Sequence, residues 1–375
     1  MRGSTDDSTT DCAFPCDVIT MRRVILKCDH GASTIVMLTA VVRDLHSSCP
    51  DQFQTAVRTR YPELWRNNPH LAHLDPRDPD VEHIDCNPPL TQRSDDPPFH
   101  FIHGFLRYLG NLLNVDIKPT LFRGDLYLSR REKSWMSQVQ ELTGDEIPFW
   151  VVCAGGTFEK TIKWWEHERF QAVIDTFRDR ILFVQVGAQG DYHPELNGVV
   201  DLRGKTDLRQ LIRLIHHAQG VLCPLNLLMH LSAAVETKHD SPNRACVVIS
   251  GGGRSTQWQR YPTHQFLHTI GSLICCDTTG CGRQRTHSLG DNSLSDAADK
   301  ICVDVVGDLP HCMHMIGTAD VIRSIRRYFD GGVCNYLSAN EIDVTQRTLA
   351  GLSRNTFEEK SQLGEQPVPM PQDQL

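Results

Sequence analysis

The sequence predicts an α/β protein built on parallel β-sheets. Short apolar runs alternate with amphipathic helical patterns, most clearly over residues 199–253, and several of the apolar runs end in glycine or polar turns. This alternation is typical of strand–helix–strand units. With 375 residues the chain exceeds a usual single core, so we expect two domains and tails.

The first half opens with a strand followed by a helix. The apolar run at 22–28 predicts a strand, and the helical spacing of apolar residues from Ile35 predicts a helix that Pro50 ends. A second strand is expected at 53–59, an elaborated loop over 75–98 and a helix over 100–114. These elements predict an N-terminal domain over residues 22–145.

The second half repeats this opening. A buried strand within 147–156 runs into a glycine turn, and a helix is expected from an N-cap at Thr206 to a stop at Gly220. A strand at 220–223, a helix that carries His230 and a terminal helix capped by Thr318 follow. We expect a C-terminal domain over 146–335, and the polar composition predicts disordered tails at 1–21 and 336–375.

Composition excludes some classes of function. The net charge of -8 provides no basic field for nucleic acid, so we expect no nucleic-acid partner. No apolar run is long enough to span a bilayer, and the acidic N-terminus does not resemble a signal peptide, so we expect no transmembrane segment and a cytoplasmic location. In that compartment, the 14 cysteines predict reduced thiols or a metal site before a disulfide framework.

The stretch 204–234 carries a resemblance to a known family. It contains a Gly-Lys-Thr turn, a helix, a strand and a helix of small residues led by His230. This order resembles the C-terminal domain of glycosyltransferase family 9, the heptosyltransferases of the GT-B fold. The resemblance implies two Rossmann-like domains that face a central cleft, an acceptor domain first and a nucleotide-sugar domain second.

The resemblance also implies donor-binding residues. Thr157 and Lys163 match family positions that contact the donor phosphates, and Gln189 matches a nucleoside contact. Asn226 stands within the segment where the family has Asp-Thr-Gly, ahead of His230. The residues alone leave two alternatives to these donor contacts. The loop that carries Lys163 could be a solvated loop with surface lysines, and His230 could be a hydrogen-bonded histidine in an apolar helix.

The family places its general base, an Asp, just ahead of the first helix. Thr34 stands at that position here, and threonine is not a base near neutral pH. We therefore expect Asp29 or His30 to accept the proton from the acceptor. The alternative is that both are polar loop residues.

Five cysteines gather within residues 275–312, which we call the cysteine-rich segment. Four thiolates can hold a zinc or iron ion and staple a loop that lacks a core. Cys276, Cys281, Cys302 and Cys312 form the simplest quartet, and some family relatives carry a four-cysteine iron site. Free buried cysteines and a disulfide remain alternatives.

The resemblance to family 9 implies an inverting glycosyltransferase. It would move a sugar, heptose from ADP-heptose by family default, from a nucleoside diphosphate sugar to a hydroxyl of a glycan or a protein. Two alternatives remain: a catalytically silent GT-B-like protein that serves binding or assembly, and a redox or metal sensor that uses the cysteine-rich segment.

Overall fold

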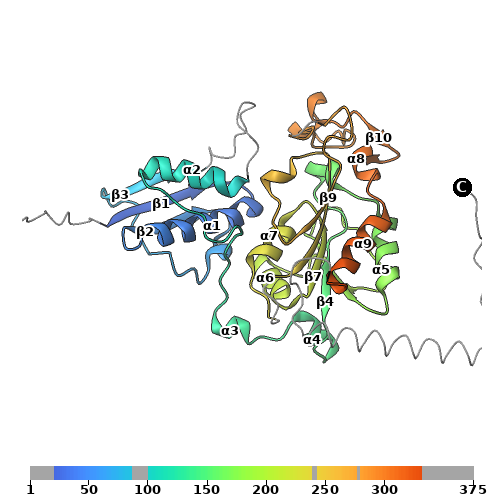
Figure 1. Cartoon of the computed structure of the whole chain (residues 1–375), viewed down its shortest axis with the longest axis horizontal. Helices are drawn as coiled ribbons and strands as arrows, with labels where there is room; N and C mark the ends of the chain where they lie inside the picture. The colour runs from blue at the N-terminus through green and yellow to red at the C-terminus, as the bar shows by residue number, and fades with distance from the viewer. Residues whose placement is uncertain (1–20, 87–99, 239–242, 277–278, 332–375) are drawn as a thin grey trace, which may run out of the picture.

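The computed structural model describes residues 21–86, 100–238, 243–276 and 279–331. Two sheets form its framework: three strands in the order β2-β1-β3 and six in the order β6-β5-β4-β7-β8-β9 (Figure 1). Every neighbouring pair within these two sheets is parallel. The predicted parallel α/β fold is thus confirmed.

The first sheet follows the predicted order. The sheet and the helices around it comprise β1 (Arg22–Cys28), α1 (Ala32–Ser48), β2 (Phe53–Thr59), η1 (Pro62–Trp65), β3 (Val81–Asp85) and α2 (Phe101–Leu113). The expectation of a loop over 75–98 is wrong in part, because β3 lies inside it and pairs with β1. Residues 87–99 of that loop lie outside the described residues.

Most of the remaining elements belong to the second sheet and the helices that connect its strands. Its first part comprises β4 (Phe149–Val152), η3 (Phe158–Lys163), α5 (His167–Phe177), β5 (Leu182–Gln185), β6 (Val200–Asp201) and α6 (Leu208–His217). Its second part comprises β7 (Gly220–Pro224), α7 (Leu227–Ala234), β8 (Ala245–Gly251), η4 (Thr256–Trp258) and β9 (Gln265–His268). The last described residues form η5 (Leu294–Asp296), η6 (Ala298–Lys300), β10 (Val305–Val306), β11 (Leu309–Pro310), α8 (His311–His314) and α9 (Thr318–Phe329).

Helix ends differ slightly from the prediction. The N-cap of α6 is Asp207 rather than Thr206, because the Asp207 carboxylate accepts from the Gln210 amide while Gln210 reaches back to complete a capping box. The C-cap of α6 is Ala218, two residues before the predicted stop at Gly220. Gly317, not Thr318, is the N-cap of α9. Of the predicted tails, residues 1–20 and 336–375 lie outside the described part of the chain.

The chain order creates a switch point between β4 and β7. From β4 the chain adds β5 and β6 on one side of the sheet, then returns to add β7, β8 and β9 on the other. The helices that follow β4 and β7 therefore leave the sheet in opposite directions, and the strand ends between them are left open. Ligands of open α/β sheets bind at this position.

The buried core continues from one sheet to the other. α1 packs against α7, and Gly124 lies where an added Cβ would meet the Val36 carbonyl at 2.5 Å and Ala234 Cβ at 3.0 Å. Side chains of α1 and α7 thus belong to the same buried cluster. The domain boundary near Glu146 stays a prediction. Within the described ranges, no helix is long and apolar enough to cross a membrane.

The linker between the sheets contains α3 (Arg130–Lys133) and α4 (Gln138–Thr143). Glu132 of α3 is buried and accepts from Arg209 of α6, with Nε to Oε1 at 2.6 Å and Nη2 to Oε2 at 2.8 Å. The Arg209 hydrogen bonds, joined by bonds from Ser129, hold the pKa of Glu132 at about 2. This bidentate pair fixes the linker to the second sheet.

The loop after β4 is tied to the loop after β5. The Gly156 amide donates to the Tyr192 carbonyl at 2.9 Å, and the Tyr192 amide donates to the Gly156 carbonyl at 3.1 Å. The Trp164 ring stacks on Tyr192 with centroids 4.3 Å apart. Gly155 has φ +99°, and a Cβ there would lie 2.0 Å from the Tyr192 carbonyl oxygen. Only glycine fits this close approach.

Replacing Glu132 tests the linker pair. In Glu132→Gln the Arg209 charge stays buried without its anion, so unfolding in urea should show a loss of about 3–5 kcal/mol. Because the pKa of Glu132 lies near 2 in the fold and at 4.5 ordinarily, the stabilisation is complete above pH 4.5 and is lost as the pH falls through 2. The difference between wild type and variant should shrink over that range.

The control is Glu141→Gln. Glu141 pairs with Arg213, but its side chain is 52% exposed, so the loss should stay below about 1 kcal/mol. Equal losses in the two variants would contradict the assignment of the linker pair.

Replacing Gly155 tests the tied loop. Both Gly155→Ala and Gly190→Ala place an alanine at positive φ, but only Gly155 faces an overlap, since nothing lies within 4 Å of a Cβ at Gly190. The Gly190 variant should cost about 1 kcal/mol of stability. The Gly155 variant should cost more, which a lower melting temperature would show. Equal melting temperatures in the two variants would refute this.

Candidate functional site

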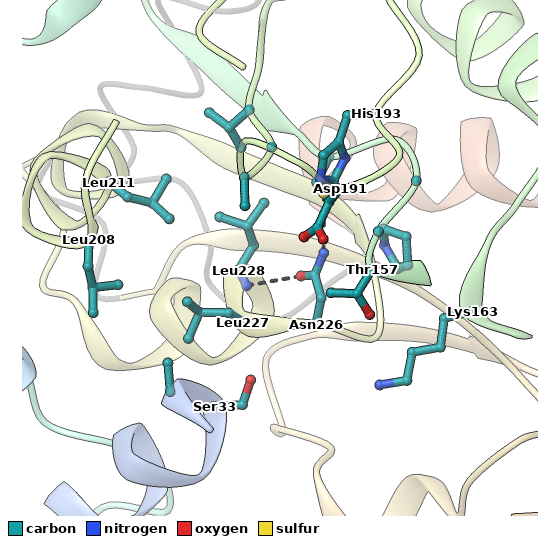
Figure 2. Close-up of a pocket in the computed structure, with 18 of the residues that line it drawn as sticks. Ser33, Thr157, Lys163, Asp191, His193, Leu208, Leu211, Asn226, Leu227 and Leu228 are labelled. Carbon is teal, nitrogen blue, oxygen red and sulfur yellow. Dashed lines mark hydrogen bonds between the residues drawn. The ribbon is translucent and has the colours of Figure 1, made fainter. Parts of the chain in front are cut away.

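A cavity of about 570 Å³ lies at the carboxyl ends of strands from both sheets (Figure 2). Its volume falls within the range of small-molecule sites. Its walls come from the loops after β1, β2, β4, β5, β6 and β7, so it includes the switch point between β4 and β7. The position is that expected for the ligand site of an open α/β sheet.

One wall is cationic. Thr157, Lys160 and Lys163 line it from the loop after β4 and from η3. Lys163 Nζ donates to the Leu225 carbonyl at 2.9 Å. Burial, together with the nearby charges of Lys160 and Arg254, lowers the pKa of Lys163 to about 7. The wall therefore holds more positive charge than its own groups neutralise, which favours an anionic ligand.

The start of α7 lies beside these lysines. Asn226 Oδ1 accepts from the Leu228 amide at 3.0 Å and so caps the helix, while Asn226 Nδ2 donates to Cys153 Sγ at 3.3 Å. Asn226, Leu227 and Leu228 all line the cavity. The partial positive charge at a helix N-terminus adds to the lysine charge. Thus Thr157, Lys163 and Asn226, predicted from the sequence, share one cavity.

The opposite wall is mainly apolar. Figure 2 shows Leu208 and Leu211 on the side away from Lys163. Half-buried Asp191 also lines the cavity, from the loop after β5. An apolar wall suits a planar base, and a carboxylate accepts hydrogen bonds from vicinal hydroxyls. The cavity therefore combines a cationic wall, an apolar wall and a carboxylate.

The first sheet contributes few groups to the cavity. Its lining residues among the described ones are Ala32 and Ser33, at the start of α1, and Tyr61. Asp29 and His30 lie just before α1 in the same loop, Asp29 exposed and His30 half-buried, and neither lines the cavity. Their role as the base stays a prediction.

Two predicted donor residues lie outside the cavity wall. Gln189 is exposed, with its Cβ near Gly204. His230 is 1% exposed, with Nδ1 2.8 Å from the Tyr261 hydroxyl and Nε2 3.3 Å from Gln259 Oε1. Burial lowers its pKa to about 3. This is the hydrogen-bonded core placement that the sequence analysis left open.

Sequence reasoning missed three lining groups. Asp191 follows Gln189 by two residues in the same loop, so its acidic side chain was an available signal. Leu208 and Leu211 lie in the helix predicted after Thr206, and their apolar spacing gives no sign of a cavity. Ser33 gave no local signal, because a serine in the first turn of a helix is ordinary.

The structure gives no support to the metal centre predicted in the cysteine-rich segment. The quartet Cys276, Cys281, Cys302 and Cys312 consists of free thiols. The Cys276 thiol donates to the Thr269 and Leu273 carbonyls, at 3.7 and 3.4 Å, and Cys302 donates to the Asp304 carbonyl at 3.2 Å. Over the ranges that the structure covers, no group of three or more His, Cys, Asp or Glu is placed to hold a metal ion. The metal prediction is therefore not supported.

Comparisons with known proteins give a family match over part of the chain. The model of glycosyltransferase family 9 (heptosyltransferase) matches residues 114–239, which include most of the loops that line the cavity. No curated protein sequence matches the chain. The sequence match therefore concerns the linker and the first part of the second sheet.

Solved structures extend the likeness to the fold. The iron-containing dodecameric glycosyltransferase TibC from enterotoxigenic E. coli H10407 matches with a TM-score of 0.53 at 15% identity, over 82% of this chain and 76% of that chain. TibC in complex with ADP-D-beta-D-heptose matches with a TM-score of 0.52 at 14% identity, over the same shares. The E. coli ADP-heptose heptosyltransferase II gives a TM-score of 0.49 at 14% identity, over 82% of this chain and 98% of that chain.

The family match and the shared fold bear on the same part of the molecule, since residues 114–239 contain β4 to α7 and the loops at the switch point. Over residues 114–239 the chain is similar to the heptosyltransferases of glycosyltransferase family 9, and its fold is similar to that of the glycosyltransferase TibC.

Proposed function

We propose that the chain transfers a sugar from a nucleoside diphosphate sugar to a hydroxyl group of a glycan or a protein, with inversion at the anomeric carbon. The observation that carries the proposal is the pairing of a cationic wall with an apolar wall in one cavity at the switch point. A nucleoside diphosphate has the same two-part character, since an apolar base is joined to an anionic diphosphate.

The residues divide the chemistry between them. The acceptor oxygen forms a bond to the anomeric carbon while the bond from that carbon to the diphosphate oxygen breaks. The charge that develops on the leaving diphosphate meets Lys163, Thr157 and the N-terminus of α7. The proton of the acceptor hydroxyl passes to Asp29 or His30, which precede the cavity-lining residues of α1.

Asp191 and the leucines bind the nucleoside in this proposal. The Asp191 carboxylate accepts hydrogen bonds from the ribose hydroxyls, and Leu208 and Leu211 pack on the base. Heptose is the proposed sugar and ADP-heptose the proposed donor, which is supported by the family's description and by the relative that was solved with ADP-D-beta-D-heptose.

A second candidate is a GT-B-like protein that binds a nucleotide sugar without turnover. It is favoured by one observation: the first sheet places Ala32, Ser33 and Tyr61 on the cavity wall, and among the described lining residues it places no carboxylate or histidine there. The two candidates differ in turnover and not in binding.

Binding of a donor panel tests the proposal. ADP-, GDP- and UDP-sugars, ADP-heptose included, should be compared by thermal shift and by slow donor hydrolysis. One donor should stabilise wild type, and Lys163→Ala should weaken its affinity about 10- to 100-fold, because a charge-assisted contact is lost. Lys118→Ala is the control, since Lys118 is 79% exposed and pairs with Asp116. No stabilisation by any donor would refute the proposal.

The same site predicts a pH dependence. The pKa of Lys163 lies at about 7 in the free protein, so its charge is present below pH 7 and is lost as the pH rises. Affinity for a nucleoside diphosphate should therefore fall from pH 6.5 to 8.5, with proton uptake on binding. Lys163→Arg keeps its charge and should flatten this profile. An identical slope in the arginine variant would contradict the assignment.

The base is tested by two substitutions. Asp29→Asn or His30→Asn should lower kcat by about 100-fold or more and leave donor affinity within about twofold of wild type, because general-base catalysis acts on the acceptor. Unchanged transfer in both variants would exclude these residues as bases. Complete absence of turnover in wild type, with donor binding intact, would favour the silent candidate.

A further inference from the structure

A third cation lies beside the two lysines of the cavity. Lys160 and Lys163 line the cavity from η3. Arg254 follows β8, more than 90 residues later in the chain, and lines a small hollow that shares Lys163 and Leu225 with the cavity. Lys163 therefore lines both spaces, one with Lys160 and the other with Arg254.

No acidic side chain neutralises this group. Across the described residues, none of Lys160, Lys163 and Arg254 forms an ion pair within 4.0 Å of an Asp or Glu. The polar contact of Lys163 is the uncharged Leu225 carbonyl. The closeness of the three is reflected in the pKa of Lys160, which burial and then Arg254 lower, and in the pKa of Lys163, which burial and then Lys160 and Arg254 lower.

The nearest acid along the chain is directed elsewhere. Glu159 precedes Lys160, but its carboxylate accepts from the hydroxyls of Ser293 and Ser295 at 2.7 Å each and lies 3.3 Å from Arg285. Arg285 is fully buried and is held by Asp291 and Asp296. Glu159, Asp291 and Asp296 thus anchor the cysteine-rich segment on η3. Among the described residues, they do not form ion pairs with the three cations.

The same segment holds η3 in position. The Ile162 amide donates to the Gln284 carbonyl at 3.2 Å, and the Thr286 amide donates to Thr161 Oγ1 at 2.8 Å. The backbone that carries Lys160 and Lys163 is therefore fixed before any ligand arrives. A fixed group of like charges with no counter-ion is a preorganised anion site.

We propose that Lys160 and Arg254 complete, with Lys163, a subsite for the diphosphate of the donor, and that this subsite makes the protein select nucleoside diphosphates over nucleoside monophosphates. The inference rests on the proposed function and extends it to two residues outside the predicted site. The leaving diphosphate gains negative charge when its bond to the sugar breaks, so the cations stabilise the transition state more than the bound donor.

The cluster has a cost in the ligand-free protein. Three like charges close together repel one another, and partial burial weakens their hydration. Removing one should therefore leave the melting temperature of the ligand-free protein unchanged or raise it. An arginine with a structural role would have the opposite effect, since its loss would lower the melting temperature.

The test compares Arg254→Gln and Lys160→Gln with wild type, using ADP, GDP and UDP and the corresponding monophosphates as probes. For whichever base binds, each variant should lose about tenfold or more in diphosphate affinity, while monophosphate affinity falls by less. The ratio of the two affinities should therefore fall. Lys160 is exposed, so its variant should fold normally. The control is Arg326→Gln, an exposed arginine on α9 that should change neither affinity.

Three results would overturn the inference. The first is that wild type binds diphosphates and both variants keep the wild-type ratio of diphosphate to monophosphate affinity. This would exclude the two residues from the subsite. A lower melting temperature in Arg254→Gln with equal losses for both kinds of nucleotide would make Arg254 structural. No binding of any nucleotide by wild type would overturn the proposed function itself.

Discussion

The parallel direction of the strands is the constraint on which the site depends. Because β4, β5 and β7 run the same way, the loops that follow them meet at one edge of the sheet, and β1 and β2 bring the loops of the first sheet to the same cavity. Chain segments that are far apart in sequence thereby become neighbours. Lys163 and Asn226, for example, lie 63 positions apart but line the same space.

Burial and charge explain how this space is specialised. A lysine in contact with solvent keeps its charge easily, whereas Lys163 is partly removed from water beside two other cations, so its pKa falls to about 7. The fold tolerates the buried lysine because Lys163 donates to the Leu225 carbonyl and because a hydrogen bond from the cysteine-rich segment holds η3 in place. In this proposal, repulsion among the three cations lowers the stability of the ligand-free protein, and the same charges favour an anionic ligand.

The sequence predicted the elements that have strong local signals. The apolar runs of β1 and β7 and the periodicity of α1 and α6 are confirmed, whereas β3, with Glu82, His83 and Asp85 among five residues, has too little apolar character to be recognised. Of the cavity-lining residues, Thr157, Lys163 and Asn226 were predicted from the family resemblance, and their role in binding stays a prediction. Arg254 was not predicted, because its approach to Lys163 depends on tertiary packing and leaves no local pattern.

The most direct test of the account is a crystal structure of the protein with a bound nucleoside diphosphate. The account predicts the diphosphate within hydrogen-bond distance of Lys163 Nζ and the start of α7, with the base against Leu208 and Leu211. A nucleotide bound outside this cavity, or bound in it with the phosphates turned away from Lys163, would contradict the account.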